Sequence, residues 1–190
     1  MLVGAGATMA CLAASAAVVW QASYSAFSAT TSNPASNWAA GSVALSDDDA
    51  NTAMFSASNL KPGSTGSKCI AVTSTGSLAS AVKLYGTSPA TSNALSSWLN
   101  LTITQGTGGS FGSCTGFTPL ASGSAVYSGT MASFATSATG YANGVGSWTP
   151  TGSGSDTRVF QVSYTFDPTA PNSTQGGTAS IGFTWEAQNS

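Results

Sequence analysis

Residues that could catalyse a reaction are scarce in this sequence, and the most versatile of them is missing. Histidine occurs nowhere among the 190 residues. A Ser-His-Asp or Cys-His nucleophile and a His-Glu-x-x-His zinc site each require at least one imidazole, so none of them can be assembled. We therefore predict that the protein is not an enzyme and that it has no catalytic residues, no metal site and no cofactor.

The six carboxylates of the chain fall into two groups. Asp156, Asp167 and Glu186 lie on or beside expected strands, where paired carboxylates could act as a general acid and base. Solvated charges at strand ends are the simpler interpretation. The other three are consecutive, at residues 47–49, and carboxylates with loop carbonyls are ligands that Ca²⁺ prefers. Consecutive side chains in a turn point apart, so we favour a solvated turn.

Cysteine usage indicates a disulfide. Cys11 lies inside an apolar N-terminal segment and would be removed with it, which leaves Cys69 and Cys114. Two cysteines in an exported chain most simply form one disulfide. The bond would close a loop of about 45 residues and, in the chain-entropy model, stabilise the fold by roughly 4 kcal/mol. A redox or metal site is the alternative, but no Cys-x-x-Cys spacing supports it.

The composition is that of one folded, weakly charged domain. Only 5% of the residues are charged and the formal net charge is −2, yet the chain has five Trp, five Tyr and eight Phe. That aromatic content suits a packed core and argues against a disordered stalk. Four basic residues cannot form an extensive phosphate-binding surface, so we expect no nucleic acid partner.

The first 25 residues differ from the rest of the chain. Residues 2–20 carry no charge, as in the apolar region of a secretory signal. Ser23 and Ser25 flank Tyr24 as the small side chains that a signal peptidase reads, which places cleavage near Ser25 and Ala26. A membrane-spanning segment is the alternative, because about 20 apolar residues suffice to cross a bilayer. We predict a secreted protein that contacts a membrane only if this segment is not cleaved.

Short strands separated by turn residues follow in the first half of the chain. Residues 41–46 and 52–57 alternate on either side of the aspartate run, which predicts a hairpin. Asn-Leu-Lys-Pro-Gly at residues 59–63 is typical of a turn. Further strands are predicted over residues 67–75 and 78–85, at the spacing of an all-β sandwich.

The second half of the chain continues this pattern. Residues 98–104 alternate strictly between apolar and polar side chains, and the runs 157–166 and 178–187 each place apolar residues at alternate positions. We expect the last two runs to be adjacent antiparallel strands joined by the loop at 167–177. Residues 130–138 allow one short helix.

Three ordered motifs and the last strand carry a resemblance to a known family. They are Trp-Ala-Ala-Gly-Ser-Val-Ala-Leu-Ser at 38–46, Ser-Asn-Leu-Lys-Pro-Gly at 58–63, Gly-Ser-Leu-Ala at 76–79 and Ala-Ser-Ile-Gly-Phe-Thr-Trp-Glu-Ala at 179–187. Together they resemble the TasA/camelysin family of secreted bacterial biofilm proteins. The resemblance implies a jelly-roll-like antiparallel β-sandwich and cleavage just before Ala26 and Phe27. It also implies head-to-tail fibres in which each subunit donates an N-terminal strand to an identical neighbour, with other matrix components as possible partners.

This resemblance gives the segment before the sandwich a function. The segment is uncharged and β-prone, and Asn33-Pro34 separates it from the domain. If it leaves its own sheet, a neighbour's segment can fill the vacated edge. The expected donor strand comprises Ala26, Phe27, Ser28, Ala29, Thr30, Thr31, Ser32 and Asn33, with Phe27 as its anchor. The alternative is a poorly ordered terminus.

We accordingly divide the chain into a signal or hydrophobic segment at 1–25, a donor strand and linker at 26–37, and a β-sandwich at 38–190. The expected function is a secreted structural subunit of a biofilm-matrix fibre. A monomeric carbohydrate-binding or adhesive module is the alternative, because Trp98, Tyr141 and Trp148 lie in polar stretches and exposed aromatic rings bind sugars.

Overall fold

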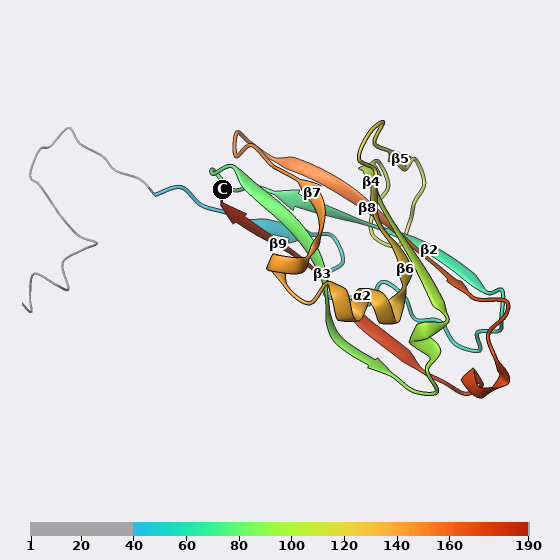
Figure 1. Ribbon diagram of the computed structural model, residues 1–190. Helices are drawn as coiled ribbons and strands as arrows, with labels where there is room; N and C mark the ends of the chain where they lie inside the picture. The colour runs from blue at the N-terminus through green and yellow to red at the C-terminus, as the bar shows by residue number, and fades with distance from the viewer. Residues whose placement is uncertain (1–39, 190) are drawn as a thin grey trace, which may run out of the picture. The chain divides into compact units, whose positions relative to one another are not determined.

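Antiparallel strands are the main regular structure of the chain (Figure 1). The computed structural model describes residues 40–189, so the predicted signal segment, cleavage region and donor strand lie outside the described residues. The strands are β1 (Leu45–Asp47), β2 (Thr65–Ser74), β3 (Ser80–Thr91), β4 (Leu99–Thr107), β5 (Thr118–Pro119), β6 (Ala125–Thr130), β7 (Val145–Trp148), β8 (Asp156–Phe166) and β9 (Ala179–Asn189). The helices are α2 (Met131–Ser137) and the 3₁₀ turns η1 (Leu95–Ser97), η2 (Tyr141–Asn143) and η3 (Asn172–Thr174).

The strands form two sheets. The larger has the order β1-β2-β8-β4-β5, with β6 also paired to β4. The smaller has the order β7-β3-β9, and its long pair runs from Ser80 opposite Asn189 to Thr91 opposite Ala179. Alternation buries one face of each sheet against the other, because successive side chains of a strand point to opposite faces.

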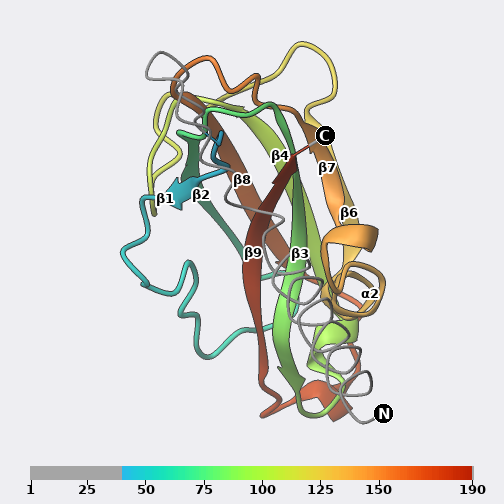
Figure 2. The same cartoon turned by 90° about the vertical axis from the view of Figure 1, so that its left-hand side faces the viewer.

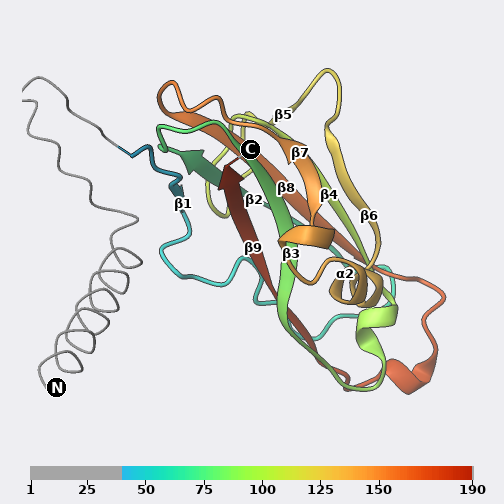
Figure 3. The same cartoon turned by 60° about the vertical axis from the view of Figure 1, so that its left-hand side comes forward.

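The core lies between the sheets, and helix α2 packs against it. Ile70, Ile103 and Val162 of the larger sheet and Leu84 of the smaller sheet are each at most 2% exposed. Helix α2 packs beside β3 and β6 (Figure 3), with the Thr130 hydroxyl accepting a hydrogen bond from the Ser133 N–H as its N-cap. It brings the fully buried ring of Phe134 into this core.

The prediction of an all-β fold with one short helix is confirmed. Strands β2, β4, β8 and β9 and helix α2 each fall within two or three residues of the predicted ranges. Alternation identified these strands because each has one face on the core and one toward solvent, apart from β9, whose inward face is only half covered.

Two predictions about pairing are wrong. Residues 52–57 form no strand and no hairpin, and β1 pairs with β2 instead, Leu45 lying opposite Ser74. Strand β8 lies between β2 and β4 in the larger sheet, whereas β9 pairs with β3 in the smaller one, so the two are not neighbours. The loop at 167–177 therefore connects the two sheets, and local alternation contains no information about that choice.

The structure joins Cys69 of β2 to Cys114 in the loop before β5, across 45 residues. The Gly112 N–H also donates to the Cys69 carbonyl at 2.9 Å, so backbone and side chain both tie this loop to the sheet. The disulfide is buried at Cys69, which is 0% exposed. It fixes the loop between β4 and β5 against β2.

Replacing both cysteines, as Cys69→Ala with Cys114→Ala, should lower the free energy of unfolding by about 2–5 kcal/mol, because the unfolded chain regains the entropy of the open loop. Denaturant unfolding of the oxidised protein and of the variant measures the difference. Reduced wild-type protein should match the variant, and equal stability of all three samples would contradict this role for the bond.

Candidate functional site: an apolar cleft along the edge of strand β9

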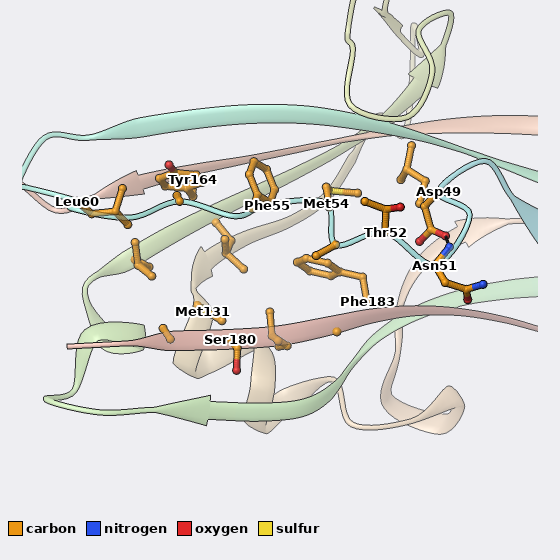
Figure 4. A pocket seen from close by; sticks show the side chains of 18 of the residues that line it. Asp49, Asn51, Thr52, Met54, Phe55, Leu60, Met131, Tyr164, Ser180 and Phe183 are labelled. Atoms are coloured by element: carbon orange, nitrogen blue, oxygen red, sulfur yellow. Dashed lines mark hydrogen bonds between the residues drawn. The ribbon is translucent and has the colours of Figure 1, made fainter. Parts of the chain in front are cut away.

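An apolar cleft of about 550 Å³ opens between the sheets, next to β9 (Figure 4). We call it the β9 cleft. The segment that follows β1 crosses it, and Figure 4 shows Phe183 of β9 on one side of this segment and Tyr164 of β8 on the other. Its apolar lining residues are Ala53, Met54, Phe55, Ala57, Leu60, Ile70, Leu99, Leu101, Met131, Tyr164, Ala179, Ile181, Phe183 and Trp185, and its polar ones are Asp49, Asn51, Thr52 and Ser180.

Strand β9 is paired on one edge only. It forms its ladder with β3, and no backbone group of β9 makes a hydrogen bond to any other described residue. Figure 2 shows β9 at the margin of its sheet, with β3 on one side and the segment after β1 on the other. An edge of this kind presents a row of free N–H and C=O groups.

The inward face of β9 is incompletely covered. None of its eleven residues is fully buried, although Ile181, Phe183 and Trp185 are large and pack against the core. Strand β8, of the same length, has four buried residues. The Trp185 indole N–H is itself buried and has no acceptor among the described residues. The β9 cleft thus combines free backbone groups, half-covered apolar side chains and an unpaired donor.

The segment that crosses the β9 cleft is held by side chains alone. Residues 53–60 make no hydrogen bond to any described residue, through backbone or side chain. Met54, Phe55 and Leu60 are half-buried against the core, and the Phe55 ring meets the Tyr164 ring edge to face, with centroids 5.3 Å apart. The other residues of the segment are exposed.

The aspartate run begins this segment and works as an anchor. Asp48 accepts hydrogen bonds from the Ala71 N–H of β2 at 2.8 Å and from the Phe111 N–H at 2.7 Å. Asp49 accepts from the Asn51 N–H at 2.6 Å. Burial raises the pKa of Asp47, and the adjacent carboxylates act in the same direction.

These hydrogen bonds occupy the carboxylate oxygens that would have to serve as ligands in a calcium site. Asp48 and Asp49 direct their oxygens to backbone N–H groups rather than toward a common point. Over the described residues, no group of three or more acidic or cysteine side chains is placed to hold a metal ion. The aspartate run is therefore better described as a set of backbone hydrogen-bond acceptors.

The three remaining carboxylates each have a different partner. Asp156 accepts from the Trp148 indole at 3.0 Å, and Thr169 lowers the pKa of Asp167 by hydrogen bonding. Hydrogen bonds from Gln188 and Tyr85 lower the pKa of Glu186. The bond to Glu186 raises the pKa of Tyr85. These contacts serve local structure and bring no two of the three carboxylates into one hydrogen-bonded pair.

The aromatic residues considered for sugar binding do not form an exposed platform. Trp148 is only 3% exposed and lies under the Arg158 guanidinium, 5.8 Å from its ring centroid. The Tyr141 hydroxyl donates to the Ala81 carbonyl, and Trp98 packs half-buried against the core. Within residues 40–189, Leu78 is the large apolar side chain classed as exposed.

Sequence reasoning missed the β9 cleft, although one signal was present. Met54 and Phe55 are adjacent large apolar residues, and in a strand they would point to opposite faces. A strand with one solvent face accommodates such a pair poorly. The pair instead fits a segment that lies within a cleft.

Asp48→Ala should lower the free energy of unfolding by about 1–3 kcal/mol, because two backbone N–H groups lose a charged acceptor. Asp49→Ala is the matched control, since it removes one contact within the turn and should cost less. Denaturant unfolding compares them. If the two variants lose the same free energy of unfolding, or if Asp48→Ala loses none, the hydrogen bonds of Asp48 contribute little to stability.

No family model and no curated protein sequence matches this chain. Over the described residues, no helix has the length and apolar character needed to cross a membrane. The cleft and edge of β9 are accordingly the basis for a functional proposal.

Proposed function

We propose that this protein is a secreted structural subunit similar to the TasA/camelysin family, with a jelly-roll fold, that polymerises into extracellular fibres of a biofilm matrix. Each subunit contributes the segment at residues 26–33 to the next. That segment adds to the free edge of β9 and places Phe27 in the β9 cleft.

The observation that carries this proposal is the unpaired edge of β9 beside a half-covered apolar face. Peptide recognition by strand addition needs both features, since backbone pairing gives affinity and pockets for alternate side chains give specificity. The donor segment supplies the complementary pattern: it is uncharged, rich in Ser, Thr and Ala, and carries one aromatic residue.

Strand addition would supply a useful binding free energy. Each new backbone hydrogen bond contributes about 0.5–1.5 kcal/mol net. Burial of the Phe27 ring adds about 1.5–3 kcal/mol. Ordering an extended segment costs about 1–2 kcal/mol of backbone entropy per residue, so for eight residues a few such bonds and one ring offset only part of this cost. Further contacts between the folded domains complete the interface.

The geometry of such a contact favours a filament over a closed dimer. The donor segment precedes the sandwich, whereas the acceptor lies on the last strand, so the two surfaces differ. A head-to-tail contact between different surfaces continues indefinitely unless its rotation closes a ring. The disulfide between Cys69 and Cys114 suits an oxidising location outside the cytoplasm.

Phe27→Asp should abolish fibres, because it would bury an unpaired charge in the β9 cleft, at a cost of several kcal/mol per contact. Phe27→Leu, the control, keeps an apolar anchor and should still polymerise. Electron microscopy and sedimentation of the processed protein provide the measurement, with circular dichroism to verify folding. Wild-type fibres from Phe27→Asp, or a lasting wild-type monomer, would contradict the proposal.

The acceptor side can be tested on β9 itself. Phe183→Ser removes a ring from the cleft, while Thr184→Ser changes the neighbouring residue, whose hydroxyl lies 3.4 Å from that of Thr87 on β3. We expect Phe183→Ser to slow fibre growth by at least about tenfold, the effect of losing 1.4 kcal/mol of contact. Thr184→Ser should grow at the wild-type rate. Equal growth of both variants would exclude this face as the acceptor.

A further inference from the structure

The segment that crosses the β9 cleft occupies the place that the donor strand would take. We propose that residues 52–58 are an intramolecular plug in the β9 cleft. Phe55 occupies the position that Phe27 of a neighbouring subunit takes in the fibre, so the plug must move out of the cleft before strand addition. This inference rests on the proposed function and adds its regulation.

The plug is weakly attached to the rest of the fold. Its residues Met54 and Phe55 contribute apolar contacts, but residues 53–60 make no hydrogen bond to any described residue. The free edge of β9 lies beside it and is not used by it. A true strand at this position would satisfy that edge. The plug therefore covers the apolar surface while leaving the backbone groups of β9 available.

The plug repeats a short sequence of the donor segment. Phe27-Ser28-Ala29 in the donor segment recurs as Phe55-Ser56-Ala57 in the plug, and each run continues through polar residues to an asparagine. In the plug, the phenylalanine of this motif lies in the β9 cleft against Tyr164. The structure thus displays how a Phe-Ser-Ala run fits this cleft.

The backbone has an uncommon conformation at both ends of the plug. Ala50 and Asn51 have φ values of 50° and 62°, and Asn59 has a φ value of 55°. These left-handed conformations are uncommon for residues other than glycine. Before them, Asp48 binds β2 and the loop at Phe111; after them, the Gly63 N–H donates to the Phe166 carbonyl. The plug is therefore a short span between two fixed points.

When the donor segment displaces the plug, the apolar contacts of the plug are lost, and the donor segment gains apolar contacts of its own together with backbone pairing to β9. The incoming Phe27 replaces Phe55, and the incoming backbone pairs with β9. While the plug fills the cleft, an approaching strand finds no apolar pocket for its side chains, so growth occurs where a donor segment displaces the plug.

The test uses a monomeric Phe27→Asp background and a fluorescent peptide of residues 26–33. In this background we expect Phe55→Ser to bind the peptide about tenfold more tightly or better, because the competing occupant is weakened. Phe117→Ser is the matched control, a half-buried phenylalanine outside the cleft, and should leave the affinity unchanged. If Phe55→Ser and Phe117→Ser bind the peptide with equal affinity, residues 52–58 do not compete with it and the inference is wrong.

A second measurement needs no change to the plug. Met54 lies in the plug and Met131 lines the cleft at 6% exposed, so mild peroxide oxidation followed by mass spectrometry reports on each separately. Adding the peptide should accelerate oxidation of Met54 severalfold while Met131 stays protected. If the peptide binds and Met54 keeps its original rate, the plug remains in place and the inference is wrong. If the peptide binds neither the background nor its variants, the donor-strand function itself fails.

Discussion

A strand at the margin of a sheet leaves one row of backbone N–H and C=O groups without sheet partners, and here that strand is β9. Proteins commonly protect such an edge with charged residues, prolines or a covering element. Strand β9 carries a single charged residue, Glu186, and no proline. A chain with 5% charged residues has few means to repel another strand. The exposed edge of β9 therefore constrains how this molecule can exist in solution and how it can associate.

The rest of the fold supports that edge with a rigid frame and a loosely held cover. The disulfide between Cys69 and Cys114, together with the paired acceptors of Asp48, fixes β2, the loop at 108–114 and the turn after β1 to one another. The plug, by contrast, contributes only apolar contacts. Stability is thus distributed unevenly, which allows one segment to move without unfolding of the core.

The local sequence pattern predicts an element when the alternation of its own residues shows which face is buried. Alternation identified β2, β4, β8 and β9, because each has one inward face, and Thr130 is the N-cap of the one α-helix among residues 40–189. The expectation that the chain is exported, together with its small number of cysteines, predicts the disulfide. Pairing was harder, since β8 and β9 have the same pattern but belong to different sheets. The sequence predicts a strand at residues 52–57, yet no hydrogen-bonding neighbour accepts it, and the adjacent Met54 and Phe55 instead fit the cleft that the segment crosses.

The central claim is that residues 26–33 of one subunit lie along β9 of another. The most direct measurement places a photoreactive benzoyl-phenylalanine at position 27 in fibres grown from mixed light and ¹⁵N-labelled subunits. We expect cross-linked peptides that join position 27 to residues within 179–189, half of them between light and heavy chains in an equal mixture. Cross-links confined to a single chain, or directed to another surface, would contradict the account.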